Sequence, residues 1–258
     1  MKVILIGYGR MGKMIGELLA ARGDVEILGA VSPGLYESPW DVPGKPDALI
    51  DFSYPGNLET TLARAEDAAS AVILGTTGLT AEQVERVRAA AKRVPVVFDA
   101  NFSLGVAVLR KALAQVGPLL LKCGFDAEIV ETHHNRKADA PSGTAKALLR
   151  AIDPAGDYAP VHGREGFTGA RGREIGVHAV RGGTVAGEHR ALFFGEDETL
   201  EFRHSAASRR IFAAGAVRAL DFAAGRAPGL YRVDDVLGLN DIRGGEIHER
   251  RGDHPLYP

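Results

Sequence analysis

Residues that could do chemistry concentrate in one short segment, residues 131–145. His133, His134 and Lys137 place two imidazoles and an ammonium within five positions. Cations neutralise carboxylates, and an imidazole near its working pKa can transfer a proton. Ser142-Gly143-Thr144 follow where a helix is expected to begin, and a helix N-terminus offers free N–H groups to an anion. The segment therefore predicts a site for a small polyanion that must also be protonated.

Two simpler interpretations of these residues are weaker. One histidine of the pair could be packed and the other solvated. This interpretation would be preferred for an isolated pair, but here a lysine and a Pro-Ser-Gly-Thr helix start follow. A zinc site could use Glu131, His133, His134 and Asp139. Neighbouring strand residues point apart, however, and no His-x-x-x-His or cysteine spacing is present, so no metal is expected. Four scattered histidines are expected to be structural or on the surface: His162, His178, His189 and His204. Arg181 could reach a carboxylate, but a sheet or subunit contact is the simpler interpretation.

A glycine motif near the N-terminus predicts a dinucleotide site. Gly7-Tyr8-Gly9-Arg10-Met11-Gly12 is G-x-G-x-x-G, between a predicted strand at Lys2–Ile6 and a predicted helix at Arg10–Arg22. The first glycine allows the tight turn, the second admits the pyrophosphate, and the third lets the helix pack closely on the sheet. The alternative, a glycine-rich turn that binds nothing, is less common in a strand–turn–helix context.

Two further loops support a nucleotide. Gly75-Thr76-Thr77-Gly78 and Ala100-Asn101-Phe102-Ser103 each follow a predicted strand. Open α/β sheets bind ligands at the carboxyl ends of their strands, and small or hydroxyl residues there leave room for a flat ring and its amide. Either loop alone would be interpreted as an ordinary strand-to-helix connection.

The first hundred residues alternate between apolar strands and amphipathic helices. After Lys2–Ile6, strands are predicted at Glu26–Val31, Ala48–Phe52, Ala71–Leu74 and Pro95–Phe98, with helices at Asn57–Ala69 and Thr80–Lys92. Four prolines between Ser32 and Asp47 leave little room for a crossover helix, so this segment is expected to be a loop. The alternation predicts a Rossmann-type α/β domain with a parallel, doubly wound sheet.

The pattern changes after residue 104 to that of an α+β domain with a mixed sheet. Helices are predicted at Leu104–Leu121, Ser142–Ile152 and Ile211–Phe222, and strands at Phe125–His134, Glu174–Arg181, Thr184–Phe194 and Thr199–His204. Gly156–Arg173 is rich in glycine and arginine and is expected to be a loop.

Composition excludes several partner classes. The 258 residues carry a formal net charge of −2, so no basic surplus favours nucleic acid or acidic membranes. The single Cys123 excludes an internal disulfide and is expected to be a buried, inert thiol in a reducing compartment. No apolar run is expected to serve as a signal peptide or membrane span, which predicts a cytoplasmic protein.

The segment from His133 to Thr144 resembles the signature of the 4-hydroxy-tetrahydrodipicolinate reductase (dihydrodipicolinate reductase) family. The similarity extends to about Asn240 and is supported by Gly7–Gly12, Gly75–Gly78, Ala100–Ser103 and the run from Arg181 to His189. The resemblance implies an NAD(P)H-dependent reductase of lysine biosynthesis through diaminopimelate, acting on a cyclic imine with two carboxylates.

The resemblance also implies residue roles, with NADPH or NADH as cofactor. It assigns proton transfer to His133 and Lys137, and substrate binding to His134, Gly143 and Thr144. It assigns cofactor binding to Gly7, Tyr8, Gly9, Arg10, Met11, Gly12, Ser32, Gly75, Thr76, Thr77, Ala100, Asn101 and Phe102.

At the scale of the whole chain, the resemblance implies a homotetramer and a division into domains. The dinucleotide-binding domain would comprise residues 1–104, completed by 208–240. Residues 105–207 would bind substrate and form the tetramer through their sheet, and 241–258 would be a tail without an implied role.

One position departs from the usual pattern. Ser32 ends the second strand where an acidic residue usually binds the ribose 2′-hydroxyl, and Pro33 follows it rather than a basic residue. Use of both nucleotides with a modest preference for NADPH is therefore expected. Two other functions stay open: a non-catalytic nucleotide-binding regulator, and a different dehydrogenase of the same architecture that acts on an amino acid.

Overall fold

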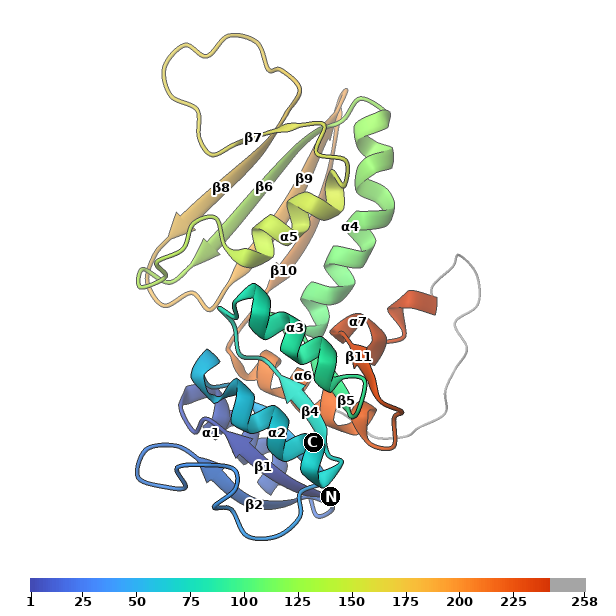
Figure 1. The fold of residues 1–258 in the computed structure, drawn as a ribbon. Coiled ribbons are helices and arrows are strands. Elements are labelled where there is room, and N and C mark those ends of the chain that lie inside the picture. Colours follow the sequence, from blue (N-terminus) through green and yellow to red (C-terminus); the bar gives the residue numbers. More distant parts are fainter. Residues whose placement is uncertain (242–258) are drawn as a thin grey trace.

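The computed structural model describes residues 1–241, so most of the predicted tail lies outside the described residues. Two sheets organise the fold, one in the lower and one in the upper part of Figure 1. Helix α4 (Leu104–Lys122) runs from the lower unit into the upper one (Figure 1). The chain later returns to the lower unit, so residues distant in sequence meet where the two units join.

The first sheet has six strands, all parallel. Their order is β11-β5-β4-β3-β1-β2, with bounds β1 (Lys2–Ile6), β2 (Glu26–Val31), β3 (Ala48–Asp51), β4 (Ala71–Leu74), β5 (Pro95–Phe98) and β11 (Gly229–Tyr231). Strand β1 pairs with β2 on one side and β3 on the other, so connections diverge at its carboxyl end. Such a divergence is where open α/β sheets form their ligand crevice.

Helices cover both faces of this sheet, which confirms the doubly wound prediction. Helices α1 (Arg10–Ala20) and α6 (Arg210–Ala223) contribute to the core on one face, through side chains such as Ile15 and Leu220. Helices α2 (Leu58–Ala68) and α3 (Ala81–Ala90) contribute to the core on the other face, through Leu62 and Val87. Burial of these side chains is the main source of stability for such layers.

The chain returns to the first sheet after residue 205, as the family resemblance implies. Helix α6 approaches the loop after β5 so closely that a Cβ on Gly215 would lie 1.8 Å from the carbonyl oxygen of Phe102. Beyond it follow β11, helix α7 (Val233–Val236) and the turn Leu239–Asp241. The sequence did not predict β11, because three residues are too few to show a strand period. The proposed domain boundaries at 104 and 207 stay a prediction.

The segment between β2 and β3 contains no helix, as its prolines predict. It folds back on β2 through a single bridge between Val31 and Tyr36, and the amide of Ser32 donates to the carbonyl of Tyr36 at 3.0 Å. Ser32 therefore lies at the carboxyl edge of the first sheet with its backbone held in a tight turn.

The second sheet is mixed, with strand order β10-β9-β6-β8-β7. Its strands are β6 (Asp126–His133), β7 (Ala159–Val161), β8 (Glu174–Arg181), β9 (Glu188–Gly195) and β10 (Glu198–Ser205). Strand β6 lies at the centre, parallel to β8 and antiparallel to β9. Helices α4 and α5 (Gly143–Ile152) pack on one face and meet where a Cβ on Gly117 would lie 2.9 Å from the Cα of Ile152.

Three local predictions for this part of the chain were wrong. Strand β7 lies inside the expected loop, and β9 begins at Glu188 rather than Thr184 because Gly183 and Gly187 turn the backbone at φ +48° and +155°. Cys123 is exposed, because it caps the last turn of α4, beyond the part of the helix that packs.

Helix α4 is long and apolar enough to cross a membrane by length and composition, which the sequence analysis did not anticipate. In this fold Leu113 and Leu121 belong to the core of the second unit, and Arg110 pairs with Asp234 of α7 at 2.6 Å. The helix therefore serves as the connection between the two units.

Candidate active site at the junction of the two units

Strand β6 carries two ionisable side chains of the site, Glu131 and His133. Alternation along the strand places Ile129, Glu131 and His133 on the face covered by α4 and α5. The side chain of Glu131 has no exposed surface, and that of His133 is 12% exposed. The strand therefore carries a buried carboxylate and, two residues later at its end, an imidazole with limited access to solvent.

Glu131 is the centre of a polar network. It binds Nδ1 of His133, and it accepts from both terminal nitrogens of Arg181 at 2.8 and 2.9 Å and from the amide of Ser142 at 3.0 Å. Burial would raise the pKa of Glu131, but these donors lower it below its usual value, so the carboxylate is ionised. Arg181, at the end of β8, thus forms an ion pair with the neighbouring strand β6, which is a sheet contact as expected from the sequence.

His189 joins this network and was not anticipated. It is 4% exposed, pairs across the sheet with Glu131, and lies edge-on to His133 with ring centroids 5.1 Å apart. Its Nε2 is 3.2 Å from the hydroxyl of Ser142. Burial lowers the pKa of His189 to about 4, so this second imidazole is neutral at physiological pH.

The donor atoms of Glu131, His133 and His189 lie within 4.8 Å of one another, close enough to consider a cation. Both carboxylate oxygens, however, already accept hydrogen bonds from the Arg181 guanidinium. A metal ion would have to displace that positive charge. This chemistry favours an Arg–Glu–His network over a metal centre.

The loop after β6 holds Lys137 close by. The carbonyl of His133 accepts from Gly182 at 2.9 Å and the amide of Asn135 donates to Gly183 at 3.2 Å, so the Arg-Gly-Gly turn fixes the loop. Lys137 forms an ion pair with Asp139 at 2.7 Å and is 22% exposed. The pKa of His133 is lowered mainly by burial. Glu131 opposes this shift, and the charge of Lys137 adds to it.

Helix α5 begins directly beside these residues. Ser142 is its N-cap and accepts from the amide of Ala145 at 3.1 Å. The next residues, Gly143 and Thr144, therefore contribute helix N-terminal amides, and no side chain projects from Gly143. This end of α5 can hold a carboxylate within reach of the imidazole and ammonium groups.

His134 lies at a different surface from His133. Its Nε2 is 3.2 Å from the guanidinium of Arg209, which precedes α6. Burial lowers the pKa of Arg209, and the nearby Arg10 and Arg136 lower it further. Among the side chains of residues 1–240 none of these three arginines has a carboxylate partner, so the cluster offers uncompensated positive charge to an anion.

The glycine motif has the geometry that a dinucleotide requires. Gly7 adopts φ +86°, and a Cβ on Gly12 would lie 2.0 Å from the carbonyl oxygen of Gly7. No atom lies within 4 Å of the position a Cβ would take on Gly9, and no side chain caps the start of α1. An open cradle below an uncapped helix N-terminus fits a pyrophosphate.

Two of the predicted cofactor residues can offer only their backbone. The hydroxyl of Thr76 donates to buried Asp51 at 2.7 Å and accepts from the amide of Ser53 at 2.9 Å, and Thr76 is 2% exposed. Phe102 is 1% exposed and packs on Phe52 with centroids 5.2 Å apart. Thr77 and Ala100, in contrast, are exposed at the carboxyl edge of the sheet.

One hydrogen bond links the nucleotide edge to the charged loop. The amide nitrogen of Asn101, after β5, donates to the hydroxyl of Thr144 at 3.0 Å. Ser103 approaches His204 of β10 at 3.4 Å beside it. The sequence placed Asn101 and Thr144 in separate sites, and the structure brings them together at one junction.

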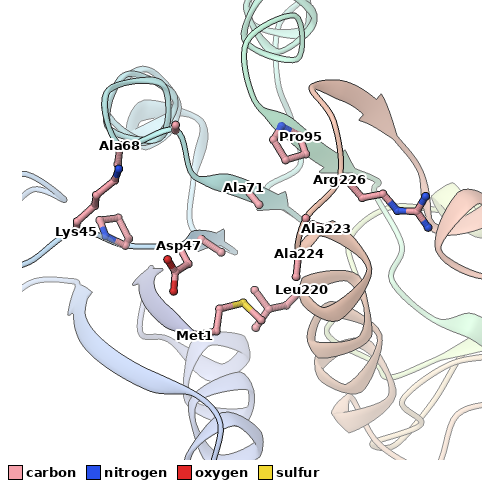
Figure 2. Close-up of a pocket in the computed structure, with 14 residues that line it drawn as sticks. Met1, Lys45, Asp47, Ala68, Ala71, Pro95, Leu220, Ala223, Ala224 and Arg226 are labelled. Carbon is pink, nitrogen blue, oxygen red and sulfur yellow. The ribbon is translucent and has the colours of Figure 1, made fainter. Parts of the chain in front are cut away.

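A hollow of about 530 Å³ lies elsewhere, at the amino ends of the parallel strands. Figure 2 shows Met1, Asp47 and Pro95 around it, together with Leu220 from α6. The glycine motif lies at the opposite edge of this sheet, where β1 ends. The hollow is therefore separate from the candidate site.

Comparisons with known proteins agree with this architecture. Residues 1–102 match the family model for the N-terminus of dihydrodipicolinate reductase, and residues 105–237 match the model for its C-terminus. A 4-hydroxy-tetrahydrodipicolinate reductase of Exiguobacterium sp. is 40% identical over 242 residues, covering 92% of this chain and 95% of the relative. One from Pseudomonas fluorescens is 46% identical over 226 residues, covering 86% and 84%.

A solved structure shows the same fold. The dipicolinate-bound dihydrodipicolinate reductase from Paenisporosarcina sp. TG-14 superimposes with a TM-score of 0.71 at 23% identity, covering 90% of this chain and 97% of that one. The chain therefore belongs to the dihydrodipicolinate reductase family of NAD(P)H-dependent oxidoreductases.

Proposed function

We propose that this chain reduces 4-hydroxy-tetrahydrodipicolinate to tetrahydrodipicolinate in lysine biosynthesis through diaminopimelate. The observation that carries the proposal is the hydrogen bond from Asn101 to Thr144. It joins the loop expected to face a nicotinamide to the helix start expected to hold a carboxylate. Family membership over nearly the whole chain supports the same reaction.

The residues at the junction suit the chemistry. Loss of the 4-hydroxyl as water gives a conjugated ring, to which a bound nicotinamide would supply hydride. His133 donates the one proton that accompanies the hydride to the adjacent ring carbon, and Lys137, released from Asp139, supplies positive charge and an alternative donor for that proton. Gly143 and Thr144 bind one carboxylate at the start of α5, and His134 beside Arg209 binds the other.

An absorbance assay tests the proposal. Freshly generated product of the preceding lyase step, added to enzyme and NADPH, should cause loss of the reduced-nicotinamide band. Pyridine-2,6-dicarboxylate should compete with the substrate but not with the nucleotide. Nucleotide binding without turnover would favour a non-catalytic regulator instead, and turnover only with an amino acid or oxo acid would favour a different dehydrogenase.

We infer that both NADPH and NADH are accepted, with a modest preference for NADPH. Ser32 brings no carboxylate to repel a 2′-phosphate, and its turn backbone leaves the hydroxyl as a hydrogen-bond donor. One charge-assisted hydrogen bond is worth ~1.5–3 kcal/mol. Ser32→Asp should therefore reverse the preference, chiefly by weakening NADPH, as calorimetric titration of both nucleotides would measure. A wild-type protein with far tighter binding of NADH would contradict this.

We also propose a homotetramer in the cytoplasm. The second sheet has helices on one face, whereas Val180 and Phe194 on its other face are exposed at 47% and 41%. Phe167, in the loop after β7, is fully exposed as well. Covering these side chains with other subunits would remove apolar surface from water. Sedimentation should give a tetramer in wild type and smaller species for Phe194→Glu, and a wild-type monomer would contradict the assembly.

A further inference from the structure

We propose that Glu131 is a positioning residue for proton transfer, which holds His133 in one tautomer and fixes the start of α5 with the same carboxylate. The inference rests on the proposed function for its kinetic consequences. Its structural content, the state of the His133 ring, can be measured whether or not the reaction is as proposed.

The carboxylate of Glu131 is saturated with donors. One oxygen accepts from Arg181 and from His133 Nδ1, and the other accepts from Arg181 and from the amide of Ser142. Two oxygens offer about four lone-pair positions, so every position is occupied. A fully buried carboxylate with four partners is held in one position, so it fixes both the His133 ring and the start of α5 that bind to it.

The same contacts fix the tautomer of His133. An ionised carboxylate can only accept, so Nδ1 of His133 must carry a proton and donate it. Nε2 is then the nitrogen that gains and loses the proton during turnover. The chain keeps that nitrogen clear, because a Cβ on Gly187 would lie 3.1 Å from it.

His189 does not compete for this role. The hydroxyl of Ser142, which accepts from the amide of Ala145, lies 3.2 Å from Nε2 of His189 and occupies that nitrogen. Burial lowers the pKa of His189 to about 4, so this ring stays neutral. The proton donor is therefore His133, and the negative charge of Glu131 favours the charged form of that ring against the effect of burial.

The proton balance follows from these bonds. His133 transfers its Nε2 proton to the ring carbon next to the one that receives hydride, so the substrate gains one hydride, which a bound nicotinamide would supply, and one proton. The neutral imidazole that remains keeps the proton on Nδ1, which donates a hydrogen bond to Glu131, and solvent restores the proton on Nε2. Glu131 itself neither gains nor loses a proton.

Glu131→Gln tests the positioning role. The variant keeps the volume but loses the charge, so the pKa of His133 should fall and the high-pH limb of kcat/KM should move to lower pH. The value of kcat should fall about 10–100-fold, less than the ~10²–10⁴-fold of complete loss of general acid–base catalysis, because His133 itself is retained, while the dissociation constant of NADPH changes little. Glu131→Asp keeps the charge and should leave the limb near its wild-type position, even where its geometry lowers the rate.

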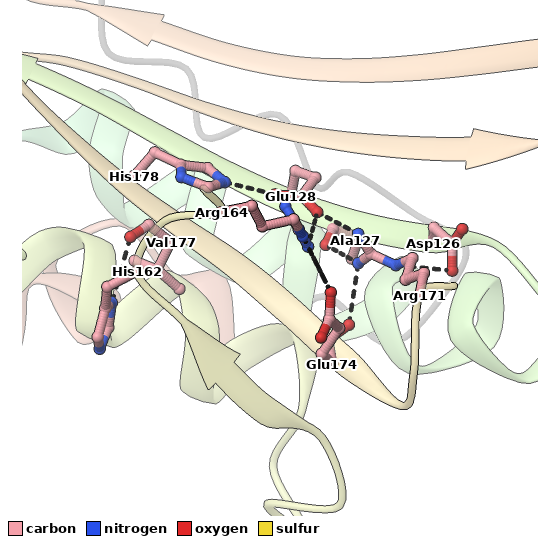
Figure 3. Close-up of polar contacts among 9 residues, drawn as sticks. All are labelled: Asp126, Ala127, Glu128, His162, Arg164, Arg171, Glu174, Val177 and His178. Carbon is pink, nitrogen blue, oxygen red and sulfur yellow. Dashed lines mark hydrogen bonds and ion pairs between the residues drawn. The ribbon is translucent and has the colours of Figure 1, made fainter. Parts of the chain in front are cut away.

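Glu128→Gln is the matched control. Glu128 lies on the same strand but on the opposite face, and its carboxylate also pairs with two arginines and a histidine: Arg164, Arg171 and His178 (Figure 3). Its replacement should leave the pH profile of kcat/KM in place. If both variants shift the profile equally, loss of general stability explains the effect and the proposal fails.

Two further readouts decide the matter. In wild type, histidine labelled with ¹⁵N in the ring should show His133 as the Nδ1–H tautomer, with a lower pKa in Glu131→Gln, and His133→Gln identifies the signal. Glu131→Gln should also add little to the loss already caused by His133→Gln. An unchanged tautomer and pKa in Glu131→Gln, or fully additive losses, would overturn the proposal. Absence of reductase activity in wild type would instead refute the proposed function, and the labelled spectra would still decide the role of Glu131.

Discussion

At the scale of single residues, the ammonium of Lys137 pairs with the carboxylate of Asp139 at 2.7 Å, which keeps its positive charge beside the site. Lys137→Ala should lower kcat and raise KM together, because the substrate loses both a counter-charge and a proton donor. We expect kcat/KM to fall about 10²-fold or more. Asp139→Asn is the control, since it removes only the resting partner and should cost much less. Steady-state kinetics with the dicarboxylate substrate measure both, and equal losses would show that the ion pair, rather than the ammonium, matters.

Thr144 contacts Asn101 and is proposed to bind a substrate carboxylate. Its hydroxyl accepts from Asn101, and its amide lies in the first turn of α5. Thr144→Val should raise KM about tenfold with a smaller change in kcat, because the lost hydrogen bond acts in ground and transition states alike. Asn101→Asp reverses the direction of the interdomain bond and serves as comparison. A large fall in kcat with unchanged KM would place Thr144 in the chemical step instead.

At the scale of elements, the contact between α6 and the loop after β5 has no spare space. A Cβ on Gly215 would overlap the carbonyl oxygen of Phe102 at 1.8 Å. Gly215→Ala should therefore destabilise the protein by about 1–3 kcal/mol or more, as overpacking does, and lower its melting temperature. Gly23→Ala is the control, since Gly23 is exposed and no atom lies within 4 Å of the position of its Cβ. A melting temperature unchanged by Gly215→Ala would mean that α6 can move away without cost.

The open face of the second sheet should respond to acid. Burial alone would raise the pKa of Glu128, but Arg164, Arg171 and His178 lower it to about 2 (Figure 3). Because the folded-state pKa lies below the unfolded value, the stabilisation is complete above pH ~4.5 and is lost as the pH falls towards 2. The contribution is roughly 3 kcal/mol at neutral pH. Urea unfolding of Glu128→Gln should show lower stability at pH 7 and a smaller loss between pH 5 and 3 than wild type, and parallel curves would contradict the assignment.

At the scale of the whole molecule, the sequence predicted what periodicity and glycine spacing encode. Short, continuous apolar runs such as Ala71–Leu74 are typical of buried parallel strands, and the glycines of the Gly7–Gly12 turn are required by backbone geometry. The expected loop between Ser32 and Asp47 was also correct, because its prolines exclude a crossover helix.

Contacts between distant residues could not be predicted in the same way. Glu131 and Arg181 are 50 positions apart, and His189 reaches Glu131 only through the register of β6 and β9. Cys123 was misplaced because an apolar run does not reveal which turn of a helix loses its packing partner. The network around His133 therefore depends on the strand register of the second sheet, which the sequence alone does not reveal.

The most direct test of the account compares wild type with His133→Gln in a single turnover of NADPH by excess freshly prepared substrate. The junction places His133 as the proton donor, so the variant should oxidise the nucleotide ~10²–10⁴-fold more slowly. Its affinity for NADPH should stay near that of wild type, because His133 lies on the second sheet, away from the glycine motif. Near wild-type oxidation rates in His133→Gln, with substrate and nucleotide both bound, would contradict the assignment of this site to the reaction.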